Sequence, residues 1–262
     1  MASIEAGDIV TYYEEAGSGE PVILICGLSA DLQIWQFQVP ALSKRYRVVC
    51  YDNRGAGRTS APDKPHSIGG MVEDLAALMD HLRIDSAHLL GWSMGGVIAQ
   101  AFALARPSRV RKLILMSTFA RSDGFVRVGI RNWINIRRSN MPFEQVIRYV
   151  SQALYTPAFY DDEPRYEKII RFMANNPYAQ TQHGFLRQAE ALFAHDPGDA
   201  AKGIRAPTLV AVGRDDSLTP PYLSERLAGL IPDATLKVLN GAHAGFAEFA
   251  DQYNAAILDF LE

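Results

Sequence analysis

The stretch Gly91-Trp92-Ser93-Met94-Gly95 decides how this chain of 262 residues is interpreted. It follows the short apolar run His88–Leu90, which has the character of a buried strand, and it opens the helical segment Ser93–Ala105. A serine at a sharp turn from strand to helix has a strained backbone, and the flanking glycines let the chain turn without a Cβ clash. Its hydroxyl projects beyond the carboxyl end of the strand, beside a helix N-terminus that favours negative charge. Ser93 is therefore predicted to be a nucleophile.

A serine hydroxyl needs a base that takes its proton, and six histidines are available for that role. His243 lies in Asn240-Gly241-Ala242-His243, directly after the apolar run Thr235–Leu239. If that run is a parallel strand, the loop after it ends at the same edge of the sheet as Ser93. We therefore predict His243 as the base.

The base in turn needs a carboxylate that fixes its tautomer and stabilises the imidazolium. The turn Gly213-Arg214-Asp215-Asp216 follows the apolar run Thr208–Val212, again at the carboxyl end of a predicted strand. From position alone, either Asp215 or Asp216 can fill this role. Only one of the two is expected to do so, and the other is expected to be a solvated turn residue.

Apolar runs alternate along the chain with segments of helical periodicity. The helical segments include Ile68–Leu82, Ser93–Ala105 and Tyr253–Leu261. The alternation predicts an α/β fold in which a mostly parallel sheet of about eight strands is flanked by helices. The predicted strands are Ile9–Glu15, Val22–Cys26, Arg47–Tyr51, His88–Leu90, Lys112–Met116, Thr208–Val212 and Thr235–Leu239.

Residues 119–203 break this alternation because no convincing strand occurs among them. A connection of this length needs a structure or function of its own, so we predict a helical cap over the sheet. The predicted domains are a core of residues 1–118 and 204–262 and a cap of residues 119–203. The predicted cap helices are Val126–Arg138, Phe143–Leu154, Pro164–Asn175 and Gly184–Phe193.

Together these motifs resemble the α/β-hydrolase superfamily over essentially the whole chain. The order serine, aspartate, histidine along the chain is the one expected of that superfamily. In similar enzymes the acid is the third residue after the glycine of its turn, which favours Asp216 over Asp215. The length and the segment Leu28–Trp35 look most like oxoadipate enol-lactonases and related small esterases. The matching pieces are Asp52–Ser60, Gly91–Gly96, Gly213–Asp216 with Pro220, and Gly241–His243.

The resemblance also implies an oxyanion hole made of two backbone N–H groups. One belongs to Met94, the residue after the nucleophile, and the other to Leu28, in the loop after the strand Val22–Cys26. Many relatives carry His-Gly in this loop, whereas this chain has Cys26-Gly27. The difference keeps the backbone donor but removes a histidine that often braces the loop. Cys26 itself is expected to be buried and inert.

Composition excludes several classes of function. The net charge is −3, so no basic field is available to hold a nucleic acid or an anionic membrane. No apolar stretch approaches 18 residues, and the first residues lack the pattern of a signal peptide, so we expect a cytoplasmic protein. The two cysteines, Cys26 and Cys50, form no metal-ligand cluster, and no G-x-G-x-x-G motif occurs. We therefore expect neither a metal nor a cofactor.

The predicted cap begins with a basic segment. Between Phe119 and Arg148, six arginines face two acids, a net charge of +4 in a chain whose total is −3. A helix over Val126–Arg138 places Ile130, Trp133, Ile134 and Arg137 on one face, where Trp133 and Ile134 are predicted to form a pocket wall. The arginines form either a basic outer surface or, through Arg137 or Arg121, an inward contact to a substrate carboxylate.

These observations predict a cofactor-free serine hydrolase that cleaves a small carboxylic ester or lactone through an acyl-enzyme intermediate. Hydrolases of C–C bonds and of amides or carbamates can use the same three side chains, so they stay as alternatives. A protein of another class, which senses a ligand and turns it over slowly, is also compatible with the motifs. The natural substrate and the oligomeric state stay open.

Overall fold

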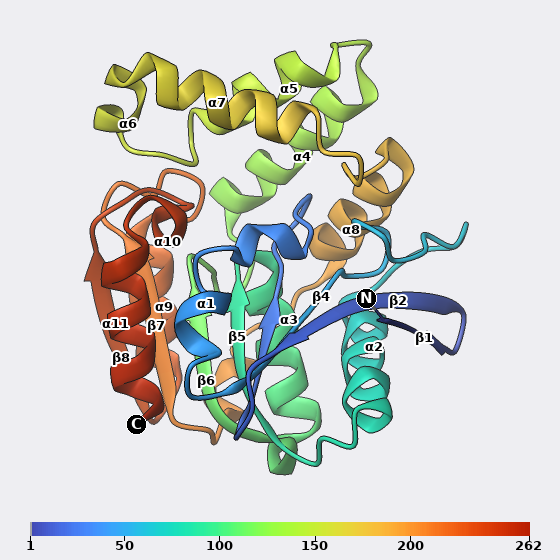
Figure 1. Ribbon diagram of the computed structural model, residues 1–262, viewed down its shortest axis with the longest axis vertical. Helices are drawn as coiled ribbons and strands as arrows, with labels where there is room; N and C mark the ends of the chain where they lie inside the picture. Colours follow the sequence, from blue (N-terminus) through green and yellow to red (C-terminus); the bar gives the residue numbers. More distant parts are fainter. Residues whose placement is uncertain (1) are drawn as a thin grey trace.

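One twisted sheet lies at the centre of the molecule (Figure 1). The computed structural model describes residues 2–262, and within them eight strands pair in the order β1-β2-β4-β3-β5-β6-β7-β8. β2 pairs antiparallel with β1 and β4, and the other neighbours are parallel. The strands are β1 Ala2–Ala6, β2 Ile9–Ala16, β3 Pro21–Ile25, β4 Arg47–Tyr51, β5 Ala87–Trp92, β6 Val110–Met116, β7 Thr208–Gly213 and β8 Ala234–Leu239.

The predicted α/β fold is confirmed, and each of the seven predicted strands overlaps an observed one. The eighth strand, β1, was not predicted. It is short and has a single large apolar residue, Ile4, so its sequence carries little strand signal. A turn at Gly7, where φ is 62°, brings β1 back against β2, and this pairing is what makes it a strand.

Helices cover both faces of the sheet and bury two apolar clusters. Along β3, Ile23 and Ile25 join one cluster, whereas Val22 and Leu24 join the other, because successive side chains of a strand point to opposite faces. The first cluster lies under α2 Ile68–His81, α3 Met94–Ala105 and α9 Pro221–Leu230. The second lies under α1 Val39–Leu42 and α11 Ala250–Leu261, and the short α10 Gly245–Glu248 precedes α11.

Residues 119–203 contain helices and no strand, as predicted. They connect β6 to β7, and we call them the insertion. Figure 1 shows α5, α6 and α7 above the carboxyl ends of the strands, with α4 and α8 between them and the sheet. No described helix, here or in the core, is long and apolar enough to cross a membrane. The insertion helices are α4 Gly124–Arg138, α5 Phe143–Ser151, α6 Pro157–Asp161, α7 Glu163–Ala174 and α8 Gln182–Ala194.

Two buried amides, one just before α8 and one in its middle, fasten this helix to the turn that follows β4. Gln180 Nε2 donates to the carbonyl oxygen of Gly55 at 2.9 Å, and Gln188 Nε2 donates to that of Arg54 at 2.8 Å. The Arg54 side chain is itself held by a two-point ion pair with buried Asp74, at 2.6 Å for both contacts. The division into core and cap domains stays a prediction, but this end of the insertion is firmly fixed to the core.

Candidate active site

Ser93 lies on a strained turn between β5 and α3. Its φ of 55° and ψ of −119° fall in a backbone region that residues other than glycine rarely adopt. The turn is held because Ser93 N–H donates to Met116 O at 2.9 Å and Thr118 Oγ1 donates to Ser93 O at 2.8 Å. At Gly95 a Cβ would lie 2.1 Å from the carbonyl oxygen of Ile25, so only glycine lets the turn pack on β3.

His243 and Asp216 meet at the same edge of the sheet. His243 Nδ1 lies 3.1 Å and 3.0 Å from the two carboxylate oxygens of Asp216, and both side chains are buried. Asp216 also accepts from Leu218 N–H at 3.0 Å, Thr219 N–H at 2.8 Å and Thr219 Oγ1 at 2.8 Å. These donors replace the water that a buried carboxylate loses, and they fix its direction toward His243.

Asp215 takes a different place in the same turn. Its backbone N–H donates to Gly241 O at 3.0 Å, and the residue is exposed. The structure therefore brings Asp216, and not Asp215, to His243. Position along the chain does not decide which of the two aspartates is the acid. Only the resemblance favours Asp216, because the acid of similar enzymes is the third residue after the glycine that Gly213 matches.

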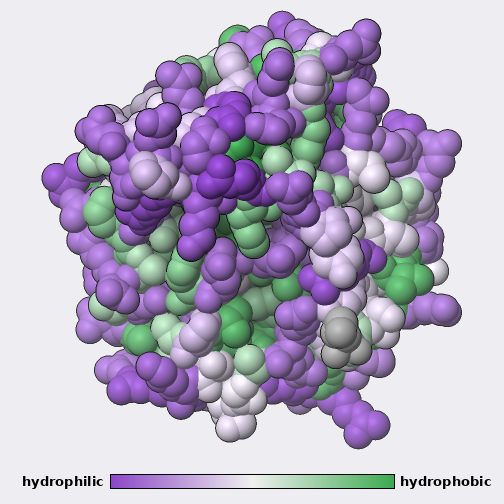
Figure 2. All heavy atoms as spheres, turned by 45° about the horizontal axis from the view of Figure 1, so that its top comes forward, coloured by the Kyte–Doolittle hydropathy of each residue, from purple (hydrophilic) through white to green (hydrophobic). Residues whose placement is uncertain are grey.

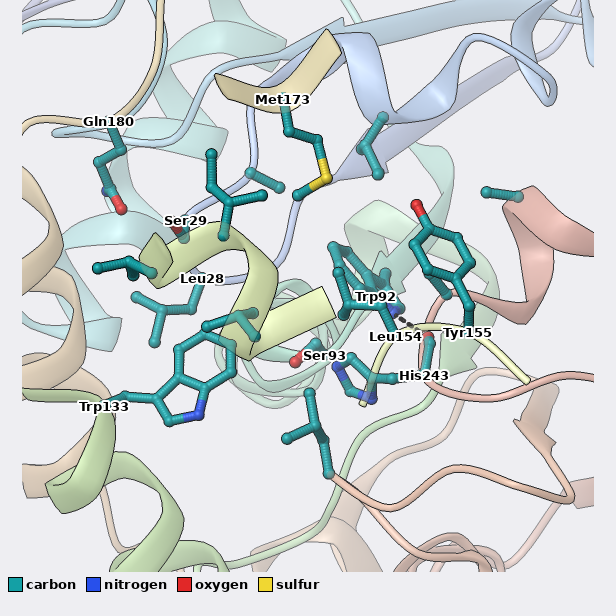
Figure 3. Close-up of a pocket in the computed structure, with 18 of the residues that line it drawn as sticks. Leu28, Ser29, Trp92, Ser93, Trp133, Leu154, Tyr155, Met173, Gln180 and His243 are labelled. Carbon is teal, nitrogen blue, oxygen red and sulfur yellow. Dashed lines mark hydrogen bonds between the residues drawn. The ribbon is translucent and has the colours of Figure 1, made fainter. Parts of the chain in front are cut away.

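Ser93 and His243 face each other in the pocket (Figure 3). Among residues 2–262 no hydrogen bond joins Ser93 Oγ to the His243 ring. Trp92 holds His243 in place, since its Nε1–H donates to His243 O at 2.9 Å and the two ring centres are 5.2 Å apart. The hydrogen bond between a catalytic serine and its histidine often tightens only when a substrate is bound.

Two backbone N–H groups next to Ser93 are available to a ligand. Met94 begins α3, so its N–H has no partner within the helix. Leu28 N–H has no acceptor among residues 2–262, and Leu28 lies along the same pocket as Ser93. A negative oxygen bonded to Ser93 would therefore find uncommitted donors at the positions that the resemblance implied.

Asn53 braces the loop that carries Leu28, a contact that the sequence analysis missed. Its Nδ2 donates to Cys26 O at 2.8 Å. No sequence pattern predicts such a hydrogen bond from a side chain to a backbone atom 27 positions away. Asp52 assists by accepting from Leu32 N–H at 2.7 Å. Cys26 is fully buried, and this burial raises the pKa of its thiol well above the ordinary value, so the thiol is kept protonated.

A cavity of about 670 Å³ opens above Ser93, between the strand ends and the insertion. Such a volume suits a ligand of drug-like size, and the wall is mainly apolar. Four phenylalanines that line it, Phe37, Phe125, Phe143 and Phe172, are between 36% and 52% exposed. Figure 2, which brings this side forward, shows apolar hollows among polar side chains. Large exposed aromatic side chains are typical of binding surfaces.

Helix α4 supplies part of the pocket wall, with one shift from the prediction. Trp133 and Arg137 line the pocket, as does Ile130. Ile134 does not, because the stripe that faces the pocket is turned toward Gly129 and Ile136, and Ile134 packs instead against the core cluster. Arg121 also lies outside the pocket: it is in the segment before α4 and is exposed. The expectation that Ile134 or Arg121 contributes to the pocket is therefore wrong.

The remaining arginines of the basic segment have other partners. Arg148 pairs with Glu167 at 2.6 Å and with Glu144, and Arg138 pairs with Glu190 at 3.0 Å. Arg127 and Arg131 place their guanidinium groups over the Phe193 ring. As for metals, residues 2–262 contain no group of three or more His, Cys, Asp or Glu placed to hold an ion.

Comparison with known proteins places this geometry in a family. A family model described as the alpha/beta hydrolase fold matches residues 20–250. The chain is 35% identical to the protein named "Putative carbamate hydrolase RutD" of Azorhizobium caulinodans, over 99% of this chain and 98% of that one. It is 29% identical to 3-oxoadipate enol-lactonase 2 of Acinetobacter baylyi, over 97% and 94% of the two chains. The crystal structure of the enol-lactonase from Burkholderia xenovorans LB400 matches 99% of each chain with a TM-score of 0.90 and 29% identity. The chain therefore belongs to the α/β-hydrolase fold family.

Proposed function

We propose that this protein is a serine hydrolase that cleaves a carboxylic ester or lactone through an acyl-enzyme intermediate. The observation that carries the proposal is the meeting of three side chains from three strand ends. Ser93 stands on a strained turn, His243 faces it, and Asp216 lies 3.0 Å from the far nitrogen of His243. This arrangement serves nucleophilic acyl transfer.

In the proposed reaction, Ser93 Oγ attacks the carbonyl carbon of the substrate. His243 Nε2 takes the serine proton, and Asp216 accepts from Nδ1–H, which keeps Nε2 free of a proton before the attack. The N–H groups of Leu28 and Met94 stabilise the negative oxygen of the tetrahedral intermediate. His243 then gives its proton to the leaving oxygen, and the ester between substrate and serine remains.

In the second half of the proposed reaction, water replaces the leaving group. His243 takes a proton from that water, the hydroxide attacks the acyl carbon, and Ser93 leaves with the proton. The products are an acid and an alcohol, or a hydroxy acid when the substrate is a lactone. The proposed reaction needs no reactant other than the substrate and water, in line with the predicted absence of a cofactor. The small-molecule partner and the cytoplasmic location also stay predictions.

The class of the cleaved bond rests on similarity. The proteins named enol-lactonase support the ester or lactone assignment. A carbamate is the second candidate, because a relative at 35% identity bears the name of a carbamate hydrolase. A hydrolase of C–C bonds and a sensor with slow turnover use the same three side chains, and no feature of the pocket favours either.

The proposal is tested by turnover and by labelling of the nucleophile. We expect many turnovers per protein molecule with p-nitrophenyl acetate and butyrate, and a fluorophosphonate adduct on the peptide that contains Ser93. A parallel series of matched esters, lactones, carbamates and amides ranks the bond types by kcat/KM. A single turnover without release would favour the sensor, and carbamates cleaved faster than matched esters would favour the second candidate. Labelling at another residue would contradict the proposal.

A further inference from the structure

Arg137 is a half-buried cation in the wall of the pocket. It stands near the end of α4, and its Nη2 donates to the carbonyl oxygen of Gln180 at 3.0 Å. Its guanidinium group lies 5.2 Å from the ring centres of both Phe143 and Phe185. The aromatic neighbours and the Gln180 carbonyl hold the group in one place, and Arg137 is among the residues that line the pocket.

No negative charge in the described residues compensates Arg137. Within residues 2–262 no carboxylate lies within 4.0 Å of its guanidinium group, and its buried Nε has no hydrogen-bond acceptor. Desolvation lowers the pKa of Arg137 from its ordinary value, which is the sign of a charge that burial disfavours. Arg148, which is half-buried like Arg137, and the exposed Arg138 each have glutamate partners. A desolvated cation without a partner is costly unless a ligand supplies the missing anion.

The two acids that line the pocket, Asp31 and Glu248, do not supply that anion, because neither lies within 4.0 Å of the Arg137 guanidinium group and both are held by other donors. Asp31 accepts from Gln33 N–H at 2.9 Å and from Asn176 Nδ2 at 2.6 Å. Glu248 accepts from Thr156 N–H at 2.9 Å and from the hydroxyl of the same residue. Both acids keep their charge, but their oxygens are occupied by donors of the protein, whereas Arg137 has N–H groups left for a ligand anion.

Two further cations line the same pocket. Lys168 and Arg165 are both exposed residues of α7, and among residues 2–262 no ion pair engages either of them. Arg165 lies over the Phe159 ring at 4.6 Å. Arg137 differs from both because it is half-buried and held by its neighbours, so it has the more defined position for an anion.

An apolar wall separates this cation from the nucleophile. Figure 3 shows Gln180, the partner of Arg137, on the side of the pocket away from His243, with Leu28 between Gln180 and Ser93 and Trp133 on the same side of Ser93. The cavity of about 670 Å³ is larger than a small ester or a simple lactone ring requires. A ligand that reaches from Ser93 to Arg137 therefore needs an apolar part between its two polar ends.

We propose that the substrate is an ester or lactone in which an apolar chain joins the reacting carbonyl to a carboxylate, and that Arg137 binds this carboxylate. The inference rests on the proposed function, since it assumes that the ester is cleaved at Ser93. A planar guanidinium group with unused N–H groups suits a two-point contact with a carboxylate. Trp133 and Ile130 then contact the chain between the two ends.

Matched substrates test the inference through a ratio. The p-nitrophenyl half-esters of succinic, adipic, suberic and sebacic acid carry a terminal carboxylate, and the p-nitrophenyl esters of butyric, hexanoic, octanoic and decanoic acid do not. We expect kcat/KM to favour the carboxylate member by about tenfold or more at one chain length, because a charge-assisted contact is formed there and not at shorter lengths. A ratio at or below one at every length would overturn the inference.

Variants show which arginine produces the preference. Arg137→Met should bring the ratio close to one, and Arg137→Lys should retain part of it, because lysine keeps the charge but not the planar group. Arg138→Met is the matched control, because Arg138 is the next residue of α4 and pairs with Glu190 on the surface. An unchanged ratio in Arg137→Met, or an equal loss in Arg138→Met, would contradict the role of Arg137.

Binding gives a readout that does not depend on turnover or on one variant. In Ser93→Ala, monomethyl suberate should bind about tenfold or more tightly than dimethyl suberate, and adding Arg137→Lys should reduce that difference. Equal binding of the two esters would count against the inference alone. Absence of ester turnover together with labelling away from Ser93 would count against the proposed function alone.

Discussion

The corner that holds Ser93, His243 and Asp216 and the pocket wall formed by the insertion are built on opposite principles. At the corner, each carboxylate oxygen of Asp216 has at least two donors, and the Ser93 backbone is fixed by hydrogen bonds on both sides. In the wall, Arg137 has one backbone acceptor and two aromatic neighbours, and exposed phenylalanines line the opening. The corner comes from strand ends, whereas most of the wall comes from helices above them.

This contrast separates the two tasks of a hydrolase. Reacting groups must be held within a fraction of an ångström, and buried hydrogen bonds at the ends of paired strands provide that precision. Recognition of an apolar chain needs area and shape more than fixed directions, and packed side chains on helices provide both. Substitutions at the corner should therefore reduce the rate for every substrate, whereas substitutions in the wall should change the ranking of substrates.

The largest effect is expected from Ser93→Ala. Removing the proposed nucleophile should lower kcat by about 10⁴-fold or more for every ester tested. The stability should change by no more than about 0.5 kcal/mol, because alanine keeps the same backbone turn. Steady-state kinetics and thermal unfolding measure the two quantities. A variant that kept a tenth of the wild-type kcat would show that Ser93 is not the nucleophile.

Asp216→Asn should be the next most damaging change. An amide at this position favours the wrong histidine tautomer, and the expected loss in kcat is about 10³- to 10⁴-fold. Asp215→Asn is the matched control in the same turn, and we expect its kcat within about threefold of the wild type, because Asp215 is exposed. A larger loss in Asp215→Asn than in Asp216→Asn would reverse the assignment.

The junction between core and insertion is tested at His66, a buried residue beside Gly55. Burial, followed by the charge of Arg54, lowers the pKa of His66 from 6.5 to about 4, and His183 and Arg187 of α8 act in the same direction. The unfolded chain therefore takes up a proton near pH 6.5 that the folded protein does not accept until about pH 4. The contribution of His66 to stability is complete above pH 6.5 and is lost as the pH falls toward 4.

His66→Phe should remove this pH dependence. Relative to the variant, the wild type should lose about 2 kcal/mol of unfolding free energy between pH 7 and pH 5, as measured by urea denaturation. His81→Phe, at an exposed position of α2, is the control and should keep the wild-type dependence. If the unfolding free energies of His66→Phe and the wild type change in parallel with pH, the junction does not hold the ring of His66 neutral.

The smallest effect is expected from Trp133→Ala in the wall. Loss of the indole, which stacks on Phe185 with ring centres 6.4 Å apart, removes apolar surface that a substrate chain would contact. The ratio of kcat/KM for p-nitrophenyl octanoate to that for the acetate should fall about tenfold. Val128→Ala, on the exposed side of α4, should leave this ratio unchanged. An equal loss for both esters would place Trp133 with the corner residues.

The two regions also differ in how far their sequence predicts them. Ser93 and His243 follow apolar strands directly, and the carboxyl ends of parallel strands meet at one edge, so sequence position alone brings them together. Helical spacing correctly predicts that Arg137 lines the pocket, but it wrongly predicts the same for Ile134. The spacing does not determine how α4 is rotated about its axis. Contacts such as Asn53 to Cys26 or Asn176 to Asp31 join residues with no shared pattern, and only the folded chain reveals them.

The place where the insertion enters the chain has a consequence for how such proteins diversify. All five insertion helices come from one uninterrupted segment between β6 and β7, and these two strands pair directly in parallel register. Recombination or gradual change within this segment alters one crossover connection and leaves every strand pairing intact. A change of substrate preference can therefore be confined to a single block of sequence, which leaves the strand ends that carry Ser93, Asp216 and His243 in place.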